Sequence, residues 1–240
     1  WRKRSEQTAE AQHAKANRYS AERLKREYER AHAEIQRSID VFYARFADNN
    51  GIVDFAETRK MLDGKQLKEF RISVEQFIRL AKNNPDGRWT QMLNNVYFKV
   101  RVSRLQALQI QIQAAIQSLS LAENAGLNRL LSDIYMDTYY RTMYEIQKGI
   151  GVGMVFAKVD EKTVETIVKK PWLESNFSKR IWGDNAKLVQ QLMTEFSQAL
   201  IRGESVKKTA EILSDRMGVG YRSAERLVRT EASHIQNEAA

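Results

Sequence analysis

Apolar side chains recur along this chain with the three- and four-residue spacing of α-helices. Within the first 46 residues they form one stripe, and Arg, Lys, Glu and Gln occupy most other positions. The stripe consists of Leu24, Tyr28, Ala31, Ile35, Ile39, Phe42 and Phe46. This spacing predicts one long helix over 5–46, which ends at the DNNG sequence of 48–51 because Asn and Gly tolerate positive φ.

The middle of the chain predicts further helices. Asp54 with Glu57 resembles a capping box for a short helix to Leu62, and Ser73 with Gln76 resembles a second one. The QIQIQ sequence alternates as a strand would, but its wider window keeps helical spacing. That window contains Leu105, Leu108, Ile112, Ala115, Ile116 and Leu119. Separate long helices are therefore predicted over 88–119 and over 122–148.

The GIGVG sequence at 149–153 marks the best boundary between domains. The prediction is a long-helix domain with basic faces over 1–150 and a smaller helical domain over 151–240. The fold class is all-α, with several long amphipathic helices joined by short loops, extended rather than one compact bundle.

Several signals place helix ends within the second of these domains. Asp160 caps a short helix that ends before Pro171, and a helix over 184–202 closes at Gly203. Ser205 is expected to cap the next helix. The GVG sequence at 218–220 is expected to turn the chain into a final helix.

Composition excludes several classes of protein and site. The chain has 240 residues, 42% of them hydrophobic, yet no apolar run is long enough to cross a membrane. Cysteine is absent, which excludes disulfides and thiolate metal sites. The three histidines lie far apart in the sequence, so neither a metal site nor a cofactor is predicted.

Positive charge is concentrated in the first half of the chain. The net charge is +9, and the first 120 residues hold 22 basic and 14 acidic side chains. No carboxylate occurs between Asp86 and Glu123, a gap that contains Arg88, Lys99, Arg101 and Arg104. These four side chains are candidates for binding DNA or another anion, and a solvated basic helix face is the alternative.

A second candidate for anion binding is the RMGVGYRSAERL sequence at 216–227. A Gly-apolar-Gly turn between helices can present backbone N–H groups to a DNA phosphate, with Arg222 and Arg226 supplying charge. An ordinary tight turn between two helices is the alternative, because such turns also favour glycine.

The last predicted helix carries Glu231 and His234 at the i, i+3 spacing that helical metal sites use. A metal or catalytic site would need partners from other helices, and the sequence offers no matching Glu-x-x-His set. Thr230 beside Glu231 is no activated nucleophile, because a carboxylate is a poor base for a hydroxyl. A structural role is therefore favoured, and no enzymatic activity is predicted.

The LVRTEASHIQNEA sequence resembles the Arg-Thr-Glu…Asn-x-Ala core of the tailed-phage minor head protein, or head-morphogenesis, family. The matching residues are Arg229, Thr230, Glu231, Asn237 and Ala239, whereas His234 lies outside the motif. Further similar segments occur in the expected order: FADNNGI at 46–52, YEIQKG at 144–149, KPW at 170–172, SKRIW at 178–182 and IRGES at 201–205. The resemblance extends from about residue 20 to residue 240.

The resemblance implies a low-copy virion component in the head interior or at the portal vertex, present in the host cytoplasm during assembly. The implied partners are the portal protein, packaged double-stranded DNA bound without sequence preference, and further copies of the chain. Scaffolding or major capsid protein is an additional candidate partner. No enzymatic step is implied, and longer family members continue beyond the motif helix, so the full protein is expected to extend past residue 240. A cellular, non-specific DNA-binding helical protein is the alternative function.

Overall fold

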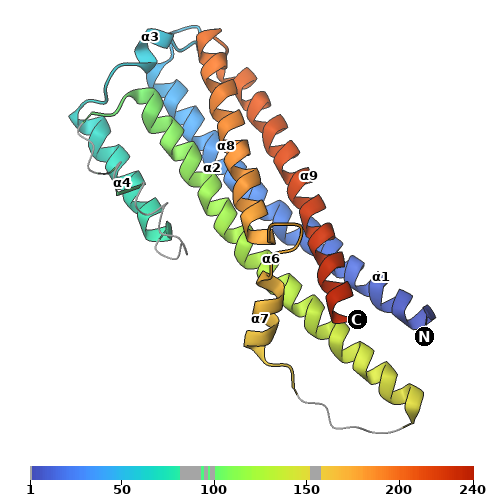
Figure 1. The fold of residues 1–240 in the computed structure, drawn as a ribbon. Helices are drawn as coiled ribbons and strands as arrows, with labels where there is room; N and C mark the ends of the chain where they lie inside the picture. The colour runs from blue at the N-terminus through green and yellow to red at the C-terminus, as the bar shows by residue number, and fades with distance from the viewer. Residues whose placement is uncertain (1, 82–92, 95–96, 98–100, 152–157) are drawn as a thin grey trace. The chain divides into compact units, whose positions relative to one another are not determined.

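The structure is a computed structural model that describes all residues except 1, 82–92, 95–96, 98–100 and 152–157 (Figure 1). Over the described residues the secondary structure is helical, and strand-type pairing is limited to isolated bridges. The predicted all-α class is therefore confirmed. The helices are α1 (Arg2–Tyr19), α2 (Lys25–Phe46), α3 (Phe55–Thr58), α4 (Gly64–Ala81), α6 (Arg104–Ile150), α7 (Glu161–Lys169), α8 (Phe177–Ile201) and α9 (Val206–Ala239). None of the helices in the described parts combines the length and the hydropathy needed to cross a bilayer.

The chain divides into two compact units, each assembled from separate stretches of sequence. Unit 1 consists of Trp1–Arg26, Ala122–Gly183 and Tyr221–Ala240. Unit 2 consists of Glu27–Leu121 and Asp184–Gly220. The domain boundary near residue 150 stays a prediction.

The long helix predicted over 5–46 is confirmed, with one irregular turn. A π-helical segment, Ser20–Leu24, joins α1 to α2. The Ser20 carbonyl accepts hydrogen bonds from the Lys25 N–H and from the Tyr221 hydroxyl, the latter at 3.1 Å. A side chain that competes for a backbone carbonyl is a known cause of such local irregularity. The apolar stripe from Leu24 to Phe42 is buried as expected.

Helix starts in the middle of the chain differ from the prediction because other capping boxes form. α4 begins at Gly64, where Asp63 and Gln66 exchange backbone-to-side-chain hydrogen bonds, so the predicted cap at Ser73 is wrong. α6 begins at Arg104 behind a similar box between Ser103 and Gln106. The predicted helix over 88–119 is therefore wrong at 101–103, which precede the helix.

The short helix after Asp54 is confirmed, but it ends at Thr58 rather than at Leu62. Asp54 caps it by accepting the Ala56 N–H at 2.9 Å. The predicted break between 119 and 122 is wrong, because α6 continues for 47 residues through Ile150. No residue that terminates helices occurs at that point, and apolar spacing persists across it.

In the last third of the chain, Asp160 caps α7, and that helix ends before Pro171 as predicted. Gly203 follows α8 with a φ of 67°, which glycine adopts without steric cost. Residues 216–227 lie inside α9, so the turn predicted at 218–220 is wrong. A Cβ at Gly220 would lie 2.9 Å from Leu188 Cδ2 and 3.2 Å from Tyr28 Cε1, so this glycine permits close helix packing.

The core of unit 2 lies where α2, α6, α8 and α9 run side by side (Figure 1). Their buried side chains meet around a small cavity and include Ile35, Ile39, Ile112, Leu192, Phe196 and Leu213. α4 packs against α6 through Phe70, Val74 and Phe77, which share a buried cluster with Ala107 and Ala114. Burial of these apolar faces provides the main driving force for folding of the unit.

The core of unit 1 combines apolar packing with a polar link between α1 and α6. Leu24, Leu127 and Val228 are buried in it. Gln12 donates a hydrogen bond to Asp137 at 2.7 Å. Burial acts to raise the pKa of Asp137, but hydrogen bonds from Gln12 and from Arg141 outweigh it and hold this pKa below its ordinary value.

Candidate functional site

Glu231 on α9 is almost completely buried and accepts hydrogen bonds with both carboxylate oxygens. The Trp172 indole N–H donates to Oε2 at 2.8 Å, and Arg180 Nη1 donates to Oε1. The side chain of Glu231 is only 2% exposed, whereas that of Arg180 is 21% exposed. The carboxylate is thus paired with a charged donor and a neutral donor, as buried charges require.

Arg180 extends this arrangement to the backbone before α8. Its Nη2 donates to the Trp172 carbonyl at 2.6 Å and to the Ser175 carbonyl at 3.4 Å. The guanidinium carbon lies 4.5 Å from the centre of the Trp172 ring, which is a cation–π distance. His234 stacks on the same indole, with ring centroids 4.2 Å apart and planes 18° apart. We refer to Trp172, Arg180, Glu231 and His234 as the Glu231 cluster.

The Glu231 cluster joins segments that are distant in sequence. Trp172 comes from the KPW segment, Arg180 from SKRIW and Glu231 from the Arg-Thr-Glu motif, and all three belong to unit 1. Sequence reasoning noted these segments separately, but it missed that they contact one another. The sequence signal that could have indicated this contact was that all three segments contribute to the same family resemblance.

Three of the other motif residues, Arg229, Thr230 and Asn237, lie on the exposed face of α9, whereas Ala239 is buried. Arg229 forms an ion pair with Glu225 at 2.9 Å, and the Thr230 hydroxyl donates to the Arg226 carbonyl at 2.9 Å. Among these motif residues, it is Glu231 that contributes its side chain to the Glu231 cluster.

Both oxygens of Glu231 are therefore engaged by protein donors, which favours a structural interpretation over a catalytic one. A general base or a metal ligand must direct an oxygen lone pair at a substrate or an ion. Within the described residues, no group of three or more His, Asp or Glu side chains has the arrangement that would hold a metal ion.

The candidate cations occupy different surroundings. Arg222 and Arg226 are exposed one turn apart on α9, and neither forms an ion pair with a described residue. Arg101 is exposed just before α6. Arg88 and Lys99 lie outside the described residues. The structure thus brings Arg222 and Arg226 together in unit 1, whereas Arg101 and Arg104 belong to unit 2.

Arg104 differs from the other candidate cations that the structure describes, because its charge is compensated. Its Nη1 lies 2.6 Å from Glu57 Oε2, and its guanidinium carbon lies 4.2 Å from the centre of the Phe46 ring. Hydrogen bonds from Lys60 and Arg104 hold the pKa of Glu57 below its ordinary value. Arg104 is therefore poorly suited to neutralise a phosphate.

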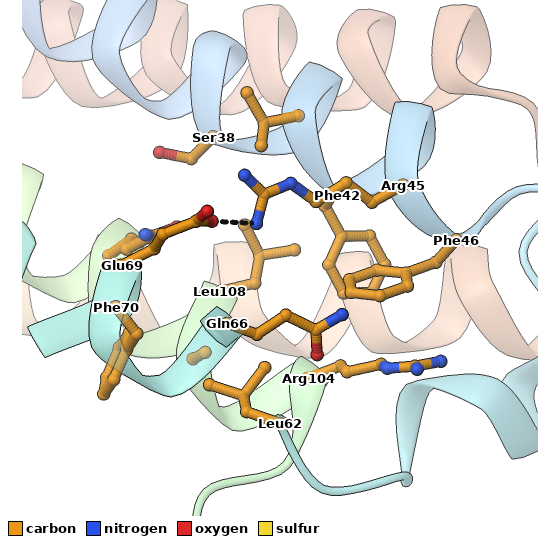
Figure 2. Close-up of a pocket in the computed structure, with 13 residues that line it drawn as sticks. Ser38, Phe42, Arg45, Phe46, Leu62, Gln66, Glu69, Phe70, Arg104 and Leu108 are labelled. Carbon is orange, nitrogen blue, oxygen red and sulfur yellow. Dashed lines mark ion pairs between the residues drawn. The ribbon is translucent and has the colours of Figure 1, made fainter. Parts of the chain in front are cut away.

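Arg104 borders a groove in unit 2 with a cavity volume of about 220 Å³ (Figure 2). Its lining consists of Ser38, Val41, Phe42, Arg45, Phe46, Leu62, Gln66, Glu69, Phe70, Arg104, Ala107, Leu108 and Gln111. Arg45 of α2 and Glu69 of α4 form an ion pair of 2.8 Å within it. About half of the lining residues are apolar, and both lining arginines pair with a glutamate, Arg45 with Glu69 and Arg104 with Glu57, so neither is well suited to bind an anion.

Comparisons with known proteins give two distant relatives. No family model matches the chain, and no solved structure matches it. Minor head protein GP7 of Bacillus phage SPP1 is 22% identical over 193 residues, which are 80% of this chain and 60% of that protein. The NAD(+)–arginine ADP-ribosyltransferase EFV of Enterococcus faecalis is 21% identical over 151 residues, which are 62% of this chain and 31% of that enzyme. The chain thus spans less than two thirds of either relative.

Proposed function

We propose that this chain is a minor structural protein of a tailed-phage head that docks at the portal vertex and contacts packaged duplex DNA without sequence preference. The similarity to a phage minor head protein over 80% of the chain carries the proposal. This distant similarity supports a structural role in a phage head and a location in the virion. The portal and the DNA are the specific partners that we add.

The contacts of Glu231 support a structural rather than an enzymatic role for the motif helix. Trp172 and Arg180 donate hydrogen bonds to its two oxygens, so this carboxylate joins α9 to α8 and to the turn before α8. The similarity to an ADP-ribosyltransferase covers 31% of that enzyme, and we do not extend its activity to this chain.

The long helices support docking on a larger assembly. α6 has 47 residues and α9 has 34. At about 1.5 Å per residue, they span roughly 70 and 50 Å. Exposed positions along such helices provide extended faces for a ring-shaped partner. Arg222 and Arg226 support the proposed DNA contact, because two exposed cations that form no ion pair with a described carboxylate suit phosphate.

Mass spectrometry of purified virions, with cross-linking, tests this function. We expect peptides of the chain in particles of the phage that encodes it, at a copy number near that of the portal protein or below it. Cross-links should join the chain to the portal. Particles from a strain with the gene deleted provide the control.

The possible results separate the parts of the proposal. If virions lack the chain, the head role is wrong, and DNA binding by the purified protein would then favour the cellular DNA-binding alternative. If virions contain the chain but its cross-links join only other head proteins, docking on the portal is wrong and the head role stands.

A further inference from the structure

The connection between α7 and α8 contains a two-residue turn whose central residues both have positive φ. The Trp172 N–H donates to the Ser175 carbonyl at 2.9 Å, and the Ser175 N–H donates to the Trp172 carbonyl at 3.3 Å. Leu173 has a φ of 49° and Glu174 a φ of 65°. These are the φ signs of a type I′ turn, for which Asn-Gly is the favoured sequence.

A Leu-Glu pair is unfavourable at these positions because a side chain with a Cβ clashes locally in the left-handed region. Burial does not compensate for this cost, since Leu173 is 79% exposed. Neither the backbone conformation nor the side chain of Leu173 therefore contributes much to the stability of unit 1. A non-glycine residue held in this region is a sign of functional constraint when the surrounding structure fixes it.

The Glu231 cluster fixes this turn at both of its ends. Arg180 donates to the carbonyls of Trp172 and Ser175, which flank the two central residues. The Trp172 side chain is in turn bound to Glu231. In addition, the Asn176 amide donates to the Lys169 carbonyl at 3.2 Å, which ties the segment after the turn to the end of α7. The turn is thus rigid, and its tip is an exposed apolar side chain.

We propose that Leu173 is a docking residue that inserts into an apolar socket on a protein partner in the phage head. Because hydrogen bonds at Trp172 and Ser175 already fix the backbone of the turn, docking through Leu173 does not require that backbone to be ordered on binding, which lowers the entropic cost. The partner is a protein, because leucine offers nothing to a phosphate and one such side chain is too small to anchor a membrane.

Charge near the turn specifies the rim of the socket. Lys170 and Lys179 are exposed and form no ion pair with another residue that the structure describes, whereas Glu174 at the tip contributes one negative charge. The two lysines outnumber the one carboxylate, so the socket on the partner is flanked by acidic side chains. This inference rests on the proposed function, because it assigns the surface through which the chain joins the head.

Incorporation of turn variants into virions tests the inference. Leu173→Asn retains a residue that tolerates positive φ but removes the apolar side chain. We expect purified Leu173→Asn protein to unfold at an unchanged or higher urea concentration, and its amount per virion to fall at least about tenfold. Ile201→Asn is the matched control, since Ile201 is a 61% exposed apolar residue at the end of α8, and its virion content should match that of the wild type.

Two further variants keep the result interpretable. Leu173→Gly should reproduce the loss of incorporation without backbone strain, and Lys170→Glu with Lys179→Glu should weaken incorporation through the rim. Wild-type amounts of Leu173→Asn and Leu173→Gly in virions would overturn the docking role while leaving the head function intact. If the wild-type chain is itself missing from virions, the proposed function fails and the docking role fails with it.

Discussion

Glu231 and Arg229 lie two positions apart in the same motif but have different surroundings. Glu231 is buried with two side-chain donors, whereas Arg229 is exposed and pairs with Glu225 one turn away. Removing one partner of a buried pair leaves the other without compensation, whereas an exposed pair contributes little. The two substitutions should therefore differ strongly in their effect on stability.

We expect Glu231→Ala to lower the free energy of unfolding by about 3 kcal/mol, because Arg180 and the Trp172 indole lose their acceptor. Arg229→Ala should lower it by no more than about 1 kcal/mol. Urea denaturation of the purified proteins measures both values. Equal effects of the two substitutions would contradict the assignment of Glu231 as the structural residue of the motif.

The contacts of Glu231 also show why the cluster was not predictable from sequence. Its bonds to Arg180 and Trp172 span 51 and 59 positions, so no local spacing reports them. The i, i+3 spacing from Glu231 instead drew attention to His234, and His234 contacts Trp172 by stacking. Sequence patterns report neighbours on one helix, whereas this cluster depends on how three segments meet.

At the scale of helices, periodicity predicted most of the elements, and caps and glycines explain several of the errors. The stripe from Leu24 to Phe42 repeats for several turns, which is a strong signal for a buried helix face. Gly218 and Gly220 instead suggested a turn. Glycine serves both turns and close helix contacts, and only the neighbours of Gly220, which are Leu188 and Tyr28, distinguish the two uses.

The close contact at Gly220 predicts an unusual response to alanine. Alanine normally stabilises a helix interior by about 1 kcal/mol relative to glycine. A Cβ at residue 220 would lie 2.9 Å from Leu188 Cδ2, so Gly220→Ala should instead lower the free energy of unfolding by about 1–2 kcal/mol. Thermal and urea denaturation measure the change.

Gly183 in α8 provides the matched control for this substitution. Among the described residues, no heavy atom beyond its own helix backbone and chain neighbours lies within 4 Å of a Cβ built at Gly183. Gly183→Ala should therefore raise the free energy of unfolding by up to about 1 kcal/mol. Stabilisation by both alanines would mean that Gly220 is not required for close packing.

For the whole molecule, unit 1 depends on contacts between stretches that are far apart in the chain. It combines Trp1–Arg26, Ala122–Gly183 and Tyr221–Ala240. The Glu231 cluster links the second stretch to the third, and the bond between Gln12 and Asp137 links the first to the second. Glu231 is therefore the motif residue that joins two distant stretches of unit 1, which supports a structural role for the motif helix.

The net charge of +9 makes non-specific DNA binding a property to test on the purified protein. Each phosphate neutralised contributes a slope of about −0.9 to the dependence of log K on log salt concentration. If Arg222 and Arg226 each contact a phosphate, then Arg222→Gln with Arg226→Gln should make this slope shallower by about 2 and weaken binding at low salt. Fluorescence anisotropy with a labelled random-sequence duplex measures both quantities.

Lys65 and Lys68 provide the charge-matched control, because both are exposed on α4 in unit 2. Lys65→Gln with Lys68→Gln removes the same charge, so any effect of net charge alone appears equally in both double variants. A specific contact through α9 requires the arginine variant to lose more of the slope. Equal losses would assign DNA binding to overall charge, and an absence of binding by the wild-type protein at low salt would remove the DNA contact from the proposed function.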